Sequence, residues 1–315
     1  MENRTLKDYA IIGLKGVAMG AADSVPGVSG GTIALIAGIY QELINTIGNI
    51  DTSIFTTWKE HGFQTMWKEM NGNFLIALIG GILLSLMTVM RLASYLLEHQ
   101  PILIWSFFFG LVLASIWFVG KKVEKWNFGT VAVFIIGAAV AYFLTTLPAA
   151  SASDSWWYLL ICGSLAVCAM ILPGISGAFI LVLLGAYEQI TKAAEEFVFW
   201  KLGLVALGAI VGLLSFSKVL KWLFKHYENI TLAVLTGFIT GSLAKIWPWK
   251  KVLENKTLKD GSQKVINDTP VLPSSFDGEP RLWAAIGLIL AGFLLIFGLE
   301  ALANIKPKKN GTDQD

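Results

Sequence analysis

The sequence has few of the residues that bind metals or form disulfides. Its 315 residues include two cysteines and three histidines. Cys162 and Cys168 lie in one apolar run, without the spacing or the companion ligands of a metal site. We therefore expect no metal and no cofactor, and we interpret both cysteines as small side chains in a hydrophobic core.

Charged residues are also scarce. They make up 15% of the chain, hydrophobic residues make up 55%, and the mean hydropathy is +0.64. One soluble core cannot bury that much apolar surface, so the composition excludes an ordinary soluble domain and predicts a membrane protein in contact with membrane lipids. The net charge is only +2 without a basic patch, which argues against nucleic acid as a partner. No cleavable signal is evident in the polar start, Met1 to Asp8.

A short glycine-rich motif occurs twice. Val25-Pro26-Gly27-Val28-Ser29-Gly30-Gly31-Thr32 is matched 147 positions later by Leu172-Pro173-Gly174-Ile175-Ser176-Gly177-Ala178-Phe179. From Val25 to Tyr40, seven of the sixteen aligned positions are identical, whereas unrelated segments share about one. A further match at an offset of 127 pairs Arg91, Tyr95, His99, Gly110 and Ser115 with Lys218, Trp222, His226, Gly237 and Ser242. The chain therefore contains an internal duplication.

The hydrophobic pattern predicts an all-α polytopic membrane protein of two repeats, residues 1–150 and 151–315. Each repeat begins with a hairpin whose arms are too short for a hydrocarbon core of about 30 Å and are separated by a proline and a glycine. Three full spans follow in each repeat. The expected hairpins are at about 9–47 and 156–191, and the spans at about 74–97, 102–120, 129–147, 200–224, 230–247 and 282–305. Residues 47–73 are interpreted as an interfacial loop or surface helix, and 250–280 as a polar loop.

The number of crossings predicts that the repeats are inverted. If each hairpin returns to its own side, each repeat crosses the membrane three times, and the second repeat must run in the opposite direction. Positive residues then gather on one side, at Arg4, Lys7, 121–125, Lys221, Lys225 and the C-terminal lysines. This predicts that both termini face the cytoplasm. The lysines of 250–264 oppose this orientation in part, but that loop also carries acids.

Inverted hairpins would bring the two turns together near the membrane midplane. Irregular backbone at that depth must be buried in protein or line water. Backbone N–H groups, bare glycines and hydroxyls suit a phosphate or a carboxylate there. The alternative is that these turns only allow close helix crossings. The predicted phosphate-binding residues are Ser24, Gly27, Val28, Ser29, Gly30, Gly31 and Thr32 in the first turn, and Gly174, Ile175, Ser176 and Gly177 in the second.

Ionisable residues within apolar segments form a second group of candidates. Arg91 and Lys218 hold matching places in spans, where a charge suggests function; alternatively, each reaches the interface from a helix end. An acid at Asp23 could carry a coupling proton or cation, or could cap a helix. Glutamates near the interface are more often solvated. The candidates for coupling or gating are Asp23, Lys15, Glu42, Glu188, Tyr40 and Tyr187.

The run from Asp23 to Thr32 with Gly38-Ile39-Tyr40, echoed by Leu172 to Gly177, resembles the bacterial polyprenyl-phosphate transporter family. The resemblance extends over about 10–302. It implies a flippase, not an enzyme, that returns undecaprenyl phosphate, the lipid carrier of cell-wall precursors, from the outer to the cytoplasmic leaflet. It also implies that both turns hold the phosphate. The second turn departs from the first at Ala178 and Phe179, so we expect a larger contribution from Ser29 and its glycines than from Ser176.

Two other functions remain open. Membrane undecaprenyl-pyrophosphate phosphatases have a similar plan, but their serine turn continues with an arginine, whereas glycines follow Ser29 and Ser176 here. The group that would bind the transferring phosphoryl is therefore missing. A transporter of a small soluble anion is the third reading. The sequence leaves the coupling ion, the direction of net flux, the prenyl chain length and the oligomeric state open.

Overall fold

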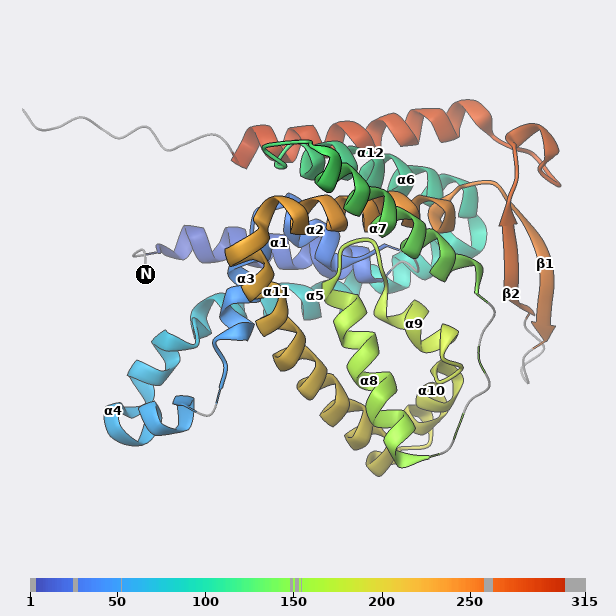
Figure 1. Ribbon diagram of the computed structural model, residues 1–315. Coiled ribbons are helices and arrows are strands. Elements are labelled where there is room, and N and C mark those ends of the chain that lie inside the picture. The colour runs from blue at the N-terminus through green and yellow to red at the C-terminus, as the bar shows by residue number, and fades with distance from the viewer. Residues whose placement is uncertain are drawn as a thin grey trace, which may run out of the picture.

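The computed structural model describes residues 4–24, 28–51, 53–147, 150, 153, 155–257 and 263–303 (Figure 1). Most of this described part is helical. The first half contains α1 (Leu6–Asp23), α2 (Gly30–Ile36), α3 (Tyr40–Gly48), α4 (Ser53–Glu69), α5 (Gly72–His99), α6 (Pro101–Gly120) and α7 (Phe128–Thr146). The second contains α8 (Trp156–Ile171), α9 (Gly177–Leu183), α10 (Tyr187–Glu195), α11 (Phe199–Ser242), the 3₁₀ turns η1 (Leu243–Ile246) and η2 (Pro273–Ser275), strands β1 (Lys250–Thr257) and β2 (Gln263–Pro270), and α12 (Leu282–Ala303).

Four helices in the described part are long and apolar enough to cross a membrane, namely α5, α6, α7 and α11. The first three coincide with the spans predicted at 74–97, 102–120 and 129–147. The spans predicted at 200–224 and 230–247 are the two arms of α11, which turns back on itself at Tyr227, where φ is −139° and ψ is 46° (Figure 1). The last predicted span corresponds to α12, and its final two residues lie outside the described residues.

The second arm of each predicted hairpin is two helices rather than one. In the first hairpin this second arm divides into α2 and α3, and in the second hairpin it divides into α9 and α10. The breaks fall at Gly38 and Gly185, which both have a φ of +72°, a conformation that glycine adopts without a steric penalty. Residues that match at the offset of 127 positions also share backbone angles. Gln100, between α5 and α6, has φ −138° and ψ 49°, almost the values of Tyr227.

Glycines allow the long helices to cross at close range. Helix α12 packs on α6, α7 packs on the second arm of α11, α1 runs along α5, and α8 runs along the first arm of α11. A Cβ atom built on Gly110 of α6 would overlap the Ile289 carbonyl oxygen of α12. At the matching place in the other half, a Cβ atom on Gly237 would overlap the Phe134 carbonyl oxygen of α7. The buried core between these helices contains Val28 of the first turn, and Leu172 of the second turn packs against it.

Gly110→Ala is expected to lower the free energy of unfolding by about 1–3 kcal/mol, the usual cost of forcing atoms into a packed interior. The methyl group would meet backbone of α12, which cannot rotate away as a side chain can. Thermal unfolding in detergent measures the effect. The matched control is Gly287→Ala on α12, where a built Cβ atom has no neighbour within 4 Å. Equal unfolding midpoints for the two variants would contradict the close crossing.

The segment interpreted as a polar loop contains an antiparallel β-hairpin, with β1 paired to β2. The ends of this segment are attached to the bundle by indole groups. Trp247 Nε1 donates to the Val271 carbonyl at 2.8 Å, and Trp249 Nε1 donates to the Pro280 carbonyl at 2.9 Å. The strands carry many charged and polar residues, so apolar alternation did not reveal them. Residues 53–69 form the surface helix α4, whose only buried residue is Ile54.

Candidate functional site

The two glycine-rich turns contact each other inside the bundle. Ser29 Oγ donates to the Leu172 carbonyl at 3.3 Å, and the Gly174 N–H donates to Thr32 Oγ1 at 2.9 Å. Ser29 and Thr32 are each only 1% exposed. A Cβ atom on Gly31 would lie 2.5 Å from the Ile171 carbonyl oxygen. The structure thus brings together the two motifs that the sequence analysis singled out.

The polar groups of the first turn form hydrogen bonds with other groups of the chain. The Asp23 carboxylate accepts the Gly30 N–H at 2.7 Å, and Ser29 Oγ accepts the Gly31 N–H at 3.2 Å. Ser24 Oγ donates to the Gly20 carbonyl of its own helix at 2.8 Å. Gly27, also predicted to bind phosphate, lies outside the described residues. A carboxylate of the chain therefore occupies the beginning of α2, where the sequence analysis expected a ligand anion.

Two lysines lie at the other end of α2. Lys15 Nζ donates to the Ala37 carbonyl at 2.7 Å, and Lys122 Nζ donates to the Leu35 carbonyl at 3.2 Å. Cations are favourable at a helix C-terminus because the carbonyl groups there carry partial negative charge. Lys15 thus binds the end of α2 that is remote from the first turn. The sequence analysis did not select Lys122, because it lies in a loop cluster of charges.

Glu42 forms an ion pair with the N-terminal segment. Its carboxylate oxygens accept from the Arg4 guanidinium at 2.6 and 2.8 Å and from Asn71 Nδ2 at 2.9 Å. Nearby, the Tyr40 side chain is buried, and its ring packs edge-on against Phe224 with centroids 5.8 Å apart. Its hydroxyl has no hydrogen-bond partner in the part of the chain that the structure describes. The ion pair with Arg4 means that Glu42 anchors the N-terminal segment in this structure.

The remaining charged candidates lie apart from the contact between the turns. Lys218 is exposed on α11. Hydrogen bonds from Ser53 lower the pKa of Asp51, and the charge of Lys218 lowers it further, so this lysine lies toward the surface near that acid. Arg91 belongs to α5, but its side chain is outside the described residues. Tyr187 and Glu188 are half-buried at the start of α10.

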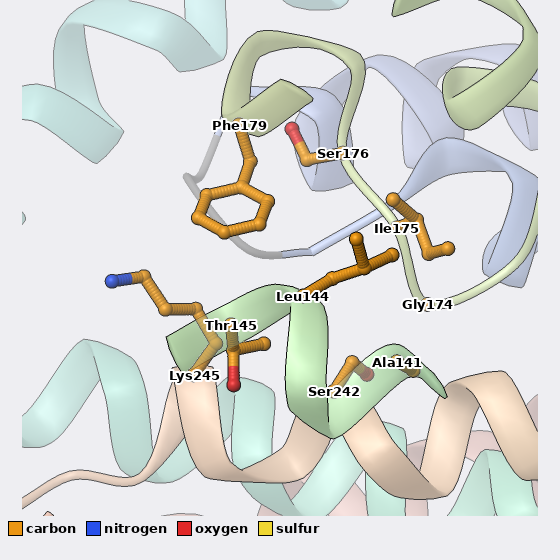
Figure 2. A pocket seen from close by; sticks show the side chains of 9 residues that line it. All are labelled: Ala141, Leu144, Thr145, Gly174, Ile175, Ser176, Phe179, Ser242 and Lys245. Atoms are coloured by element: carbon orange, nitrogen blue, oxygen red, sulfur yellow. The ribbon is translucent and has the colours of Figure 1, made fainter. Parts of the chain in front are cut away.

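The second turn lines a small pocket, and the described residues of the first turn are not part of its lining (Figure 2). Gly174, Ile175 and Ser176 form one wall, and the ends of α7 and α11 form the other. Unlike Ser29, Ser176 makes no capping bond with its side chain. The Lys245 ammonium lies 5.7 Å from the centroid of the Phe179 ring. The sequence analysis missed Lys245 because a lysine beside a polar loop is ordinary, and only its place in the fold distinguishes it.

The two turns therefore differ in accessibility. All seven residues of α2 are buried, whereas only one of the seven residues of α9, Gly177, is buried. Within the described ranges, no three His, Cys, Asp or Glu side chains gather into a group that could hold a metal ion. The polar side chains that line the pocket are those of Thr145, Ser176, Ser242 and Lys245, and hydroxyl and ammonium donors of this kind can bind an anion.

Comparison with known proteins gives consistent matches. A family described as undecaprenyl phosphate translocase-like matches residues 19–264. A polyprenyl-phosphate transporter of Vibrio cholerae serotype O1 is 43% identical over 307 residues, covering 96% of this chain and 99% of the relative. A polyprenyl-phosphate transporter of Staphylococcus aureus is 33% identical over 257 residues, covering 75% of this chain and 85% of the relative. No solved structure has significant similarity.

Proposed function

The chain belongs to the undecaprenyl phosphate translocase-like family, as its motifs predicted, and we propose that it is a flippase for undecaprenyl phosphate. It moves the lipid from the outer to the cytoplasmic leaflet of the bacterial inner membrane and catalyses no reaction. Both relatives described above are named polyprenyl-phosphate transporters. The observation that carries the proposal is the contact between two matching polar turns inside an apolar helical bundle. A charged head group needs such an interior path, because it cannot cross hydrocarbon unaided.

An inverted repeat with a central site is part of this proposal. The repetition is supported by the equal backbone angles at Gly38 and Gly185, and by the similar angles at Gln100 and Tyr227. The packing also supports it, since α7 and α12 each cross the matching helix of the opposite half. In transporters with inverted repeats, rocking of one half against the other opens a midplane site to each side in turn. Asp23, half-buried at the first turn, would respond to a coupling proton or cation.

The orientation rests on contacts at one end of the bundle. Arg4 pairs with Glu42 at the start of α3, and Gln41 Nε2 donates to Glu228 at 2.8 Å, beside the bend of α11. The Glu124 N–H donates to Asn229 Oδ1 at 2.9 Å. The N-terminus and the positive loop at 121–127 therefore share one end, which supports a cytoplasmic N-terminus. The C-terminal lysines lie outside the described residues.

Transport in proteoliposomes tests the function. We expect protein-dependent movement of a short-chain polyprenyl phosphate between leaflets, without release of inorganic phosphate. Release of phosphate in proportion to the protein would reject the flippase and favour the phosphatase. Transport of inorganic phosphate, with no movement of the lipid, would favour the transporter of a small anion. Empty liposomes and liposomes with an unrelated membrane protein are the controls.

A further inference from the structure

We propose that the pocket beside the second turn receives the phosphate head group of the lipid before it reaches the contact between the turns, and that Lys245 supplies its positive charge. This inference rests on the proposed function and adds a loading site to it. In Figure 2 the Lys245 side chain lies below the Phe179 ring and Ser176 lies above it, so the ammonium group and Ser176 are on opposite sides of the ring in this view. Nothing in the sequence motif includes Lys245, which lies 69 positions after Ser176.

The lining of the pocket matches a phosphate monoester attached to an apolar tail. A lysine ammonium binds phosphate as a point charge with three donors, and Ser176 and Thr145, which both carry hydroxyl groups, line opposite walls of the same pocket. Phe179 and Leu144 supply apolar contacts. The adjoining face of α9 is open, because Ala178 and Val182 are exposed. A prenyl chain can therefore lie along α9 in the lipid while its head group occupies the pocket. The pocket is small, so binding requires the long Lys245 chain and the Phe179 ring to separate.

The matching place in the first half has different chemistry. By the two offsets, Lys245 corresponds to Phe118, and Phe179 corresponds to Thr32. Thr32 is buried and bonded to the second turn, and Lys122, which lies 4.9 Å from the Phe118 ring, donates to a carbonyl of α2. Of the two turns, as far as the structure describes them, the second is thus the one beside a pocket that a lysine lines. An asymmetric charge gives a transporter a preferred side for capturing an anion.

The position of Lys245 assigns this pocket to the outer leaflet. Lys245 belongs to η1, which leads into β1 and β2, and Figure 1 shows these strands at the end of the bundle away from the N-terminus. Lys250 Nζ donates to the Lys245 carbonyl at 2.6 Å and lies 4.1 Å from the Trp105 ring. Tryptophan and lysine typically gather at the membrane–water interface. A head group captured there comes from the leaflet opposite the N-terminus.

Substitution of Lys245 provides the test. Lys245→Gln removes the charge at similar length, and we expect about a tenfold higher half-saturating concentration of farnesyl phosphate for transport, with little change in the saturated rate. Lys245→Arg should restore most of the affinity. The matched control is Lys251→Gln, since Lys251 is exposed and lies 3.6 Å from Asp277 on the surface. An unchanged half-saturating concentration in Lys245→Gln would overturn the inference.

Direct binding to the purified full-length protein separates this inference from the proposed function. Farnesyl phosphate, farnesol and inorganic phosphate are titrated against the wild type and Lys245→Gln in detergent. If farnesyl phosphate binds tightly to the wild type and about tenfold more weakly to Lys245→Gln, the binding result supports the pocket. This holds even if the wild type does not transport the lipid, a result that would reject the flippase. Equal binding of farnesol would exclude a role for the phosphate. Inorganic phosphate bound as tightly as farnesyl phosphate would exclude a lipid site. If the wild type transports the lipid but farnesyl phosphate binds equally to the wild type and Lys245→Gln, the proposed role of the pocket is wrong and the proposed function is unaffected.

Discussion

Replacing Gly31 with valine is expected to abolish movement of polyprenyl phosphate while the protein still inserts into the membrane. A Cβ atom at this position would lie 2.5 Å from the Ile171 carbonyl oxygen and 3.2 Å from the Met170 carbonyl oxygen. Both are backbone atoms of the segment that leads into the second turn, so the methyl groups can be accommodated only if the turns separate. Separation would break the bonds from Ser29 to Leu172 and from Gly174 to Thr32. The expected loss in rate is at least about a hundredfold, because about 3 kcal/mol of overpacking corresponds to two decades.

The measurement for Gly31→Val is transport in proteoliposomes with matched amounts of inserted protein. Gly203→Val on α11 is the control, because a built Cβ atom there has no neighbour within 4 Å and the residue is exposed. It introduces the same side chain into another helix. A wild-type rate for Gly31→Val would mean that contact between the turns is not needed for transport. The transport rate of Gly31→Ala should fall between that of the wild type and that of Gly31→Val.

Asp23→Asn is expected to leave the fold intact and to remove gradient-driven accumulation of the lipid. The carboxylate accepts the Gly30 N–H at 2.7 Å, and an amide oxygen can accept the same bond. Asparagine carries no charge and binds no additional proton, so a coupling role would be lost while the cap of α2 remains. Asp23→Leu removes the acceptor as well. It should also destabilise the protein by about 1–3 kcal/mol, the cost of an unpaired buried donor.

Transport with and without an imposed ion gradient distinguishes the two roles of Asp23. The wild type should accumulate lipid phosphate in one leaflet under the gradient, whereas Asp23→Asn should only equilibrate it. Asp51→Asn is the control, since Asp51 is an exposed acid in the loop before α4. If Asp23→Asn accumulates lipid as the wild type does, the carboxylate serves only to cap α2.

Several features were predictable because they depend on short stretches of sequence. Apolar runs of sufficient length predicted α5, α6, α7 and α12, and the turn at Tyr227 follows from the predicted gap between two spans. The repeated motif indicated the family, which the relatives confirm. Gly38 and Gly185 match in the alignment, yet the helix breaks at these glycines were not predicted. A single glycine is tolerated within a helix, and only its positive φ reveals a break.

The partners of the polar side chains were the least predictable part. Glu42, a candidate for gating, is bonded to Arg4, and Lys15 is bonded to the end of α2. Each interaction joins residues more than twenty positions apart, and such pairs are set by how helices pack. The β-hairpin was missed for a similar reason, because its strands gain their hydrogen bonds from each other and not from an apolar face.

The sequence alone was sufficient to establish a membrane protein, a duplication and two matching turns, since hydropathy and repetition are properties of the residues themselves. Only the tertiary structure revealed that Ser29 and Thr32 bond to the second turn, that Asp23 binds the start of α2, and that Lys245 lines a pocket with Ser176. The physical reason is that a buried donor or acceptor bonds to whichever partner the packing brings within about 3 Å. Packing joins segments that lie far apart along the chain, so the roles of these polar groups follow from the fold.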